Sequence, residues 1–172
     1  HESFNYAALM GLPVIFVCEN NEYSVYTHLE SRQPDRPMYK IAEAHGWEVD
    51  TGNGNDLKQV AEISLQAVSR VRTNGCPQFL EFDTYRWIEH CGPNDDDHLD
   101  YRPPDQVASW KKKCPVKHME TQLLSDKIIT QKDLDSYRQS IMDEIELSFK
   151  FAQASPFPSP ESLYQFSNTV SS

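Results

Sequence analysis

An apolar run that ends abruptly in polar residues constrains the fold of this chain more than any other feature. Val14 to Cys18 are all apolar, and Glu19, Asn20 and Asn21 follow them directly. An uninterrupted apolar run of this length is typical of a strand buried on both faces, as in a parallel sheet. In open α/β sheets, ligands bind just beyond the carboxyl ends of such strands. The two asparagines are therefore predicted to lie at a ligand-binding edge.

The adjacent asparagines are consistent with two different roles. The side-chain oxygen of asparagine is a hard, neutral ligand for Mg²⁺, which in proteins commonly joins one or two protein oxygens to the phosphates of a cofactor. Asparagines at a strand end are also ordinary turn residues, because asparagine tolerates left-handed backbone and bonds its own backbone. The spacing of Asn20 and Asn21 alone favours the turn.

Helices and strands are predicted to alternate through the first part of the chain. Gly and Pro residues or an Asn-Gly pair end the apolar periodic segments, which is how such elements are usually bounded. The expected elements are a helix at 2–10, strands at 14–18, 47–51 and 79–87, a loop at 22–37, a turn at 52–56, and helices at 38–45 and 57–74. Successive β-α-β units of this kind predict an α/β fold with a doubly wound, mostly parallel sheet.

The chain beyond Tyr101 is predicted to contain helices only. Thr130 followed by Asp133 resembles the capped start of a long helix. Apolar residues recur at helical spacing along that helix and predict a core or subunit contact: Leu134, Tyr137, Ile141, Ile145, Phe149 and Ala152. We therefore expect an α/β domain at 1–102, a helical extension at 103–154 and a Pro- and Ser-rich tail at 155–172, of which residues 155–160 should be extended.

Charge, apolar run length and cysteine spacing indicate what kind of environment suits this chain. The chain carries 16 basic and 26 acidic residues, a formal charge of -10, which would repel the phosphates of nucleic acid. No apolar run approaches the roughly 20 residues that a membrane-spanning helix needs. The cysteines form no C-x-x-C pair, so reduced thiols in an intracellular compartment are expected.

Several segments, taken together, resemble one family. Residues 2–27 are similar to the second half of a thiamine diphosphate motif that begins Gly-Asp-Gly and ends Asn-Asn. Tyr85-Arg86 with His90, an acidic stretch and then Tyr101-Arg102 resembles that family's cofactor-covering loop. Residues 49–56 and the Pro-rich close are similar to it as well. The chain resembles the C-terminal part of the alpha subunit of the decarboxylating component of 2-oxo-acid dehydrogenase complexes.

Two departures from the family pattern limit what is carried over. The Gly-Asp-Gly motif lies further upstream than this chain extends, and its metal-binding aspartate is absent. Since the chain also begins at His1 and has a hydrophobic share of only 38%, we expect it to be a fragment. The loop reads Glu89-His90-Cys91 where familiar members have Gly-His-Ser, and it is slightly longer. The serine that some members phosphorylate is missing, so the substrate class is left open.

The resemblance implies a partial thiamine diphosphate-binding fold with thiamine diphosphate and Mg²⁺ as cofactors. It assigns Mg²⁺ to the side chain of Asn21 and the backbone carbonyl of Tyr23, and it implies that the cofactor is bound by Asn21, Tyr23, Ser24, Arg86 and His90. His90 is the catalytic candidate, because an imidazole could donate to a diphosphate oxygen or a developing oxyanion. An isolated histidine is more often structural, and Arg86 could equally pair with the acidic loop.

The run Asp95-Asp96-Asp97 beside His98 is not predicted to bind a metal. Consecutive residues point in different directions, and no ligand spacing is present. We expect these carboxylates to order the loop by accepting backbone or arginine hydrogen bonds.

The activity implied by the resemblance is oxidative decarboxylation of a 2-oxo acid and transfer of the acyl group to a lipoyl arm on an acyltransferase partner. A beta subunit would complete the site, in an assembly of two alpha and two beta chains. The expected location is the cytoplasm, or the mitochondrial matrix in a eukaryote, and the 172 residues alone are expected to be inactive.

Two alternatives remain open. One is a related acetoin or biosynthetic thiamine enzyme with a different acceptor, which the altered Glu89-His90-Cys91 segment would allow. The other is a non-catalytic assembly subunit that keeps the fold and binds no cofactor. A Gly-Asp-Gly upstream of His1 would support the enzyme, and its absence would support the assembly subunit.

Overall fold

A computed structural model describes residues 1–164 of the chain. The described residues divide into two compact units, the first from His1 to Met119 and the second beginning at Glu120. Among the described residues, no helix is both long enough and apolar enough to cross a membrane.

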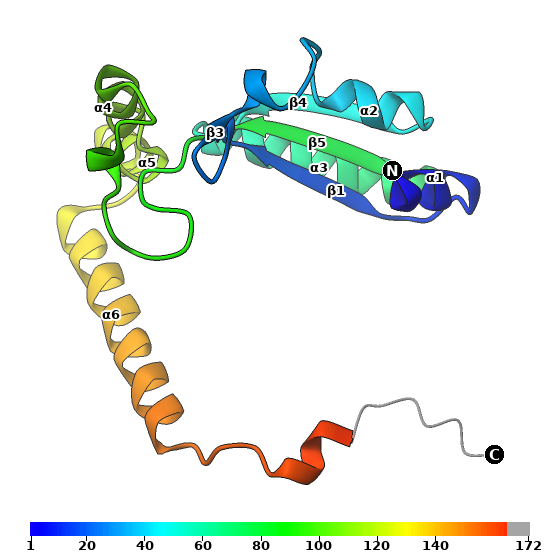
Figure 1. Cartoon of the computed structure of the whole chain (residues 1–172). Coiled ribbons are helices and arrows are strands. Elements are labelled where there is room, and N and C mark those ends of the chain that lie inside the picture. Colours follow the sequence, from blue (N-terminus) through cyan, green and yellow to red (C-terminus); the bar gives the residue numbers. More distant parts are fainter. Residues whose placement is uncertain (165–172) are drawn as a thin grey trace. The chain divides into compact units, whose positions relative to one another are not determined.

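The first unit is built on a parallel sheet of β1 (Ile15–Asn20), β5 (Gln78–Asp83) and β4 (Glu48–Asn53), in the order β1-β5-β4 (Figure 1). Both pairings are parallel. The register aligns Asn20, Asp83 and Asn53 at the carboxyl end of the sheet. This arrangement confirms the predicted α/β fold with a parallel sheet.

Helices cover both faces of this sheet. On one face, α1 (Glu2–Leu9) and α2 (Tyr39–Ala44) pack over a core cluster formed by Ala7, Ala42, Trp47 and Phe79. On the other face, α3 (Leu57–Asn74) packs over a cluster of Ala67, Leu80 and Phe82. Because the side chains of a strand alternate between the faces, β5 supplies Phe79 to one cluster and Leu80 to the other. The doubly wound arrangement is confirmed.

The ends of α3 follow from its sequence. Asp56 caps the first turn, since its side chain accepts hydrogen bonds from the backbone N–H groups of Lys58 and Gln59 at 3.1 Å each. Gly75 ends the helix with a φ of 67°, a left-handed conformation that glycine adopts without a side-chain clash.

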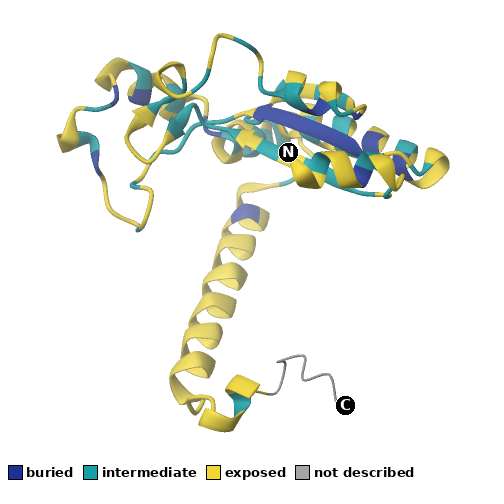
Figure 2. Ribbon diagram, turned by 45° about the vertical axis from the view of Figure 1, so that its right-hand side comes forward, coloured by how far each residue is buried: buried dark blue, intermediate teal, exposed yellow. Residues whose placement is uncertain are grey.

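The strand predicted at 14–18 is present as β1, but it is not buried on both faces among the described residues. β1 has a strand neighbour on one side only among the described residues, and the Val17 side chain is 57% exposed. The central strand is β5, in which every residue except Asp83 is buried (Figure 2). An apolar run indicates a strand, but the order of strands in the sheet depends on long-range pairing that the run does not encode.

Two boundaries differ from those expected. The predicted loop at 22–37 contains a short antiparallel hairpin, β2 (Tyr23–Ser24) and β3 (Thr27–His28), and a 3₁₀ turn, η1 (Leu29–Ser31). The strand expected to reach about Trp87 ends at Asp83. The next backbone N–H, that of Thr84, still donates to the carbonyl of Asn20 at 2.9 Å, and the chain then leaves the sheet.

The later part of the chain is helical, as predicted. It contains η2 (Asp97–Leu99), α4 (Pro104–Lys112), α5 (Pro115–Ser125), α6 (Gln131–Ala154) and η3 (Pro160–Tyr164). Thr130 and Asp133 form the expected capping box at the start of α6. Leu134 is buried, whereas Tyr137, Ile141, Ile145 and Phe149 are exposed, so most of the α6 stripe is not core among the described residues (Figure 2). Part of the predicted tail, 165–172, lies outside the described residues.

Candidate functional site

The carboxyl end of the sheet brings together the polar side chains that end its strands. Asn20, Asp83 and Asn53 are the last residues of β1, β5 and β4. A pocket of about 400 Å³ lies at this edge and is lined by Asn20, Glu22, Asn53, Asp83, Thr84, Trp110 and Lys113. In open α/β folds, this is the edge where ligands bind.

Both asparagines of the Asn20-Asn21 pair form turns with their own backbone. The side-chain oxygen of Asn20 accepts from the backbone N–H of Glu22 at 3.2 Å, and that of Asn21 accepts from the N–H of Tyr23 at 3.0 Å. Glu22 has a φ of 65°, in the left-handed region that is unfavourable for a residue with a side chain. The turn prediction is therefore confirmed. An amide oxygen has two lone pairs, so each oxygen keeps one position for another partner.

Arg86 binds the β2–β3 hairpin that follows this turn. Its Nη2 atom donates to the backbone carbonyl of Val25 at 2.8 Å and to the hydroxyl of Tyr101 at 2.9 Å. Val25 has a φ of 53°, which is strained for a β-branched residue. Within residues 1–164, the buried Nε atom of Arg86 has no hydrogen-bond partner. Arg86 thus holds a backbone carbonyl and a phenol rather than the loop carboxylates.

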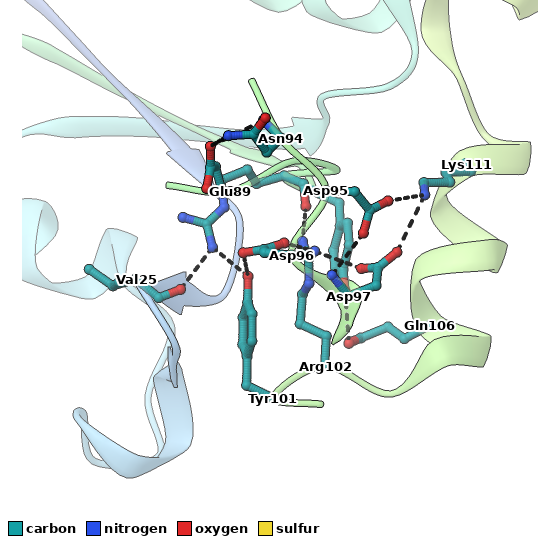
Figure 3. Close-up of polar contacts among 12 residues, drawn as sticks. Val25, Glu89, Asn94, Asp95, Asp96, Asp97, Tyr101, Arg102, Gln106 and Lys111 are labelled. Atoms are coloured by element: carbon teal, nitrogen blue, oxygen red, sulfur yellow. Dashed lines mark hydrogen bonds and ion pairs between the residues drawn. The ribbon is translucent and has the colours of Figure 1, made fainter. Parts of the chain in front are cut away.

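The acidic loop is ordered by Arg102 (Figure 3). The Arg102 and Asp96 side chains form an ion pair and are only 1% and 3% exposed. Arg102 also donates to Asp97 at 2.8 Å, while Asp96 accepts from the Tyr101 hydroxyl at 2.6 Å. Lys111 lies 3.5 Å from Asp97 at the exposed side of the network. The expected role of these carboxylates in accepting arginine hydrogen bonds is confirmed for Asp96 and Asp97.

Aromatic rings surround this ion-pair network. The Arg102 guanidinium lies 4.9 Å from the centre of the Tyr101 ring and 5.8 Å from that of Tyr85. Gln106 accepts from the hydroxyls of Tyr23 at 3.1 Å and Tyr85 at 3.3 Å. Burial raises the pKa of the Tyr23, Tyr85 and Tyr101 hydroxyls. The pKa of Tyr85 rises to about 12, although the positive charge of Arg102 acts to lower it. These hydroxyls therefore stay protonated donors at neutral pH.

The residues that depart from the family pattern form a closed turn of their own. The Glu89 carboxylate accepts from the backbone N–H of Asn94 at 3.1 Å and from its side-chain amide at 2.6 Å. A Cβ atom on Gly92 would lie 2.2 Å from Glu89 Oε1, so only glycine fits there without movement of Glu89. His90 is exposed and has no hydrogen bond, ion pair or ring contact within residues 1–164.

A comparison with known protein families finds one match that covers most of the chain, including the strand-end asparagines and the 85–102 loop. The family model described as Dehydrogenase E1 component matches residues 1–161. The chain belongs to this family. Within the Dehydrogenase E1 component family, the chain is similar to alpha subunits, as the sequence predicted.

Three relatives illustrate this similarity. The "Pyruvate dehydrogenase E1 component subunit alpha" of Rickettsia bellii is 34% identical over 95% of this chain and 49% of its own length. The mitochondrial alpha subunit of Dictyostelium discoideum is 32% identical over 95% of this chain and 42% of its own. A chloroplastic alpha-3 subunit of Oryza sativa is 30% identical over 91% and 36%. The chain thus spans about half the length, or less, of these relatives.

The structure brings four of the predicted site residues together and leaves His90 apart from them. Asn21, Tyr23 and Ser24 lie together at the β1–β2 turn, and Ser24 is exposed. Arg86 joins this group through the carbonyl of Val25. His90 contacts none of them. Their roles toward a cofactor stay predictions.

Sequence reasoning missed three residues that hold the site together. Glu81 is a buried carboxylate that accepts from the Asn20 side chain, and Gln106 joins two tyrosines of the aromatic cluster. Arg102 was noted only as part of a motif. A carboxylate inside the otherwise apolar run 79–82 was the available signal for Glu81, because a buried charge needs partners.

Proposed function

We propose that this chain is part of the alpha subunit of a thiamine diphosphate-dependent 2-oxo-acid dehydrogenase. The observation that carries the proposal is the Asn20-Asn21 turn at the carboxyl end of a parallel sheet, in a member of the Dehydrogenase E1 component family. In the proposed site, the Asn21 side-chain oxygen and the Tyr23 backbone carbonyl would hold Mg²⁺, which would supply positive charge for binding the cofactor diphosphate.

The residues present fit such a group. Mg²⁺ prefers oxygen ligands and usually takes only a few from the protein, with phosphates and water completing its octahedron. The hydrogen bond from the Tyr23 N–H fixes Asn21 Oδ1 while leaving it one lone pair. Arg86, whose buried Nε has no partner among the described residues, adds positive charge beside the same hairpin. The remaining ligands would come from outside this chain's residues.

His90 and Arg86 are proposed to act on the diphosphate side of the site. Thiamine diphosphate supplies the cleavage of the carbon–carbon bond when it is bound, and the protein binds and orients it. The His90 imidazole is exposed and has no partner within residues 1–164, so it is available to donate a hydrogen bond to a phosphate oxygen once a ligand lies against the loop. Ser24, exposed in β2, is proposed to contribute a hydroxyl to the same ligand.

The substrate and partners are proposed from the relatives. Since those relatives carry the name pyruvate dehydrogenase E1 component subunit alpha, pyruvate is the first 2-oxo acid to test. The proposed partners are a beta subunit, in an assembly of two alpha and two beta chains, and a lipoyl-bearing acyltransferase. We propose the cytoplasm as the location, or the mitochondrial matrix in a eukaryote.

The test is the thiamine diphosphate affinity of an Asn21→Ala variant, measured by calorimetric titration of the full-length alpha chain assembled with its beta chain in the presence of Mg²⁺. Loss of one metal ligand should weaken binding at least tenfold, about 1.4 kcal/mol. Tyr23→Phe should change the affinity little, because the proposed ligand is its backbone carbonyl.

Asn74→Ala is the control. Asn74 is an exposed asparagine at the end of α3, and it does not line the pocket at the carboxyl end of the sheet. The control therefore removes an asparagine side chain without removing a proposed metal ligand, and its affinity should stay at the wild-type value. Equal cofactor affinity in Asn21→Ala and the wild type would contradict the proposed metal site.

The turn formed by Glu89 supports one alternative function, a related thiamine enzyme with a different acceptor. Glu89, Gly92 and Asn94 give this loop a shape of its own, which could serve a different acceptor. Acceptor-dye assays with pyruvate, branched 2-oxo acids and acetoin would separate the related thiamine enzymes. A wild-type assembly that binds no thiamine diphosphate would instead indicate the non-catalytic assembly subunit.

A further inference from the structure

Glu81 is a buried carboxylate in the middle of the sheet, and the metal site proposed above does not use it. Its side chain is 6% exposed, on the central strand β5. One oxygen accepts from the side-chain amide of Asn20 at 2.8 Å, and the other accepts from the backbone N–H of Tyr39 at 2.8 Å. Burying a carboxylate is expensive unless its oxygens are hydrogen-bonded, and these two donors satisfy one oxygen each.

The contact with Tyr39 anchors the start of a helix. Tyr39 is the first residue of α2, and the N-cap residue Met38 provides no side-chain hydrogen bond. The first N–H groups of a helix lack partners within the helix, and a carboxylate there also interacts favourably with the helix dipole. Glu81 thus supplies the cap that the local sequence of α2 lacks.

The contact with Asn20 decides which way its carboxamide faces. Because Nδ2 points at Glu81, Oδ1 is left to accept from the backbone N–H of Glu22 at 3.2 Å. That hydrogen bond holds Glu22 in its left-handed conformation, immediately between Asn21 and Tyr23. If the carboxamide of Asn20 were reversed, its NH₂ group would face the N–H of Glu22, and the turn would lose its support.

We propose that Glu81 is a positioning residue. It acts through Asn20 to hold the oxygens of Asn21 and Tyr23 in the positions where they can bind the metal ion of a bound diphosphate. The inference rests on the proposed function. Glu81 touches no ligand in this arrangement. It orients Asn20, Asn20 supports the turn at Glu22, and the turn sets the positions of the two proposed ligands.

The chain offers a donor–acceptor exchange that tests this directly. In Glu81→Gln, only one side-chain atom can accept, so the new amide NH₂ must face either Asn20 Nδ2 or the Tyr39 N–H. In the double variant Asn20→Asp/Glu81→Gln, the carboxylate at position 20 accepts from the glutamine NH₂ and from the Glu22 N–H. The glutamine oxygen still accepts from Tyr39, and the total charge is unchanged.

The experiment measures two quantities in the full-length alpha chain assembled with its beta chain. The first is the dissociation constant for thiamine diphosphate with Mg²⁺, and the second is hydrogen exchange of residues 21–24 without any cofactor. We expect Glu81→Gln to weaken binding about tenfold and to speed exchange in the turn, and the double variant to return both values to within about threefold of wild type. Glu48→Gln, which alters a β4 carboxylate at the other end of the sheet, should change neither value.

The outcomes separate this inference from the proposed function. If Asn21→Ala weakens binding and Glu81→Gln does not, the positioning role is wrong and the metal site stands. If neither variant weakens binding, the metal site fails and the positioning role fails with it. Should Glu81→Gln not fold, the double variant decides: wild-type affinity supports the role, whereas a folded double variant with weak binding overturns it.

Discussion

The sheet and the 85–102 loop are two neighbouring regions that are stabilised by different physics. The sheet is held by apolar side chains on both faces, with Leu80 almost fully buried at 1% exposure. The loop is held by directional contacts centred on Arg102, whose side chain is equally buried. Apolar burial tolerates small shifts, because it depends on area, whereas a buried ion pair is favourable only while its geometry is complete.

This difference explains where the molecule can respond to a ligand. The polar residues that end the three strands, Asn20, Asp83 and Asn53, lie at the carboxyl end of the sheet, where a ligand can reach them. The loop depends on one arginine that joins Asp96, Asp97 and the backbone carbonyl of Arg86. A region that is held by a few strong contacts can open as a unit, which is typical of segments that order around ligands.

Arg102→Met should cause the largest loss of stability, and this loss should be confined to the 85–102 loop. Removal of the guanidinium leaves the Asp96 carboxylate buried with the Tyr101 hydroxyl as its remaining partner, which should cost about 3–5 kcal/mol. Hydrogen exchange should rise across residues 88–100 and stay unchanged in β5 and α3. The matched control is Lys111→Met, which removes only exposed ion pairs of the same loop and should cost less than about 1 kcal/mol. Equal protection of the loop in Arg102→Met and wild type would show that the ion pair does not hold it.

Leu80→Ala should have the next largest effect and should act on the sheet. It leaves a cavity between β5 and α3, with an expected loss of about 2–5 kcal/mol. Exchange should rise in β5 and α3, and the loop should lose protection only as far as the whole unit unfolds. Leu65→Ala is the control, because Leu65 lies on α3 and is 69% exposed, and it should change stability by less than about 0.5 kcal/mol. A larger effect of Leu80→Ala on the loop than on the sheet would remove the distinction between the two regions.

The same distinction explains which parts of the fold the sequence predicts. Periodicity and local breakers located the helices and strands, because apolar spacing and residues such as Gly75 act within a few positions. The order β1-β5-β4 was not predictable from those patterns, since it depends on pairings between residues about sixty positions apart, such as Val17 with Leu80.

The candidate site was predictable as a location but not as a network. The Asn20-Asn21 pair indicated the turn at the strand end, and the acidic run indicated loop order. The partners of those residues, Glu81 and Arg102, lie 61 and 6 positions away from them, and no local rule connects them. The alternative pairing of Arg86 with the loop carboxylates is not found among the described residues, because Arg102 occupies Asp96 and Asp97 while Arg86 donates to Val25 and Tyr101.

The smallest expected effect concerns the tyrosines of the loop at alkaline pH. An unfolded tyrosine has a pKa of about 10. Burial raises the pKa of Tyr85 to about 12 in the folded chain. A raised folded pKa means that the folded state holds the proton more tightly, so this contribution to stability is fully present below pH 10 and is lost as the pH rises through about 12. The protection of the loop amides from hydrogen exchange should therefore fall between pH 10 and 12 in the wild type, while β5 keeps more of its protection.

Tyr85→Phe is the control variant, because it removes the ionisable group and only a 3.3 Å hydrogen bond to Gln106. It should resemble the wild type at neutral pH and lose less loop protection between pH 10 and 12. Hydrogen exchange corrected for the intrinsic pH dependence of the exchange rate measures both. If Tyr85→Phe lost as much loop protection between pH 10 and 12 as the wild type, another group would cause the transition. Ionisation of Tyr85 would then not contribute to the difference between the loop and the sheet.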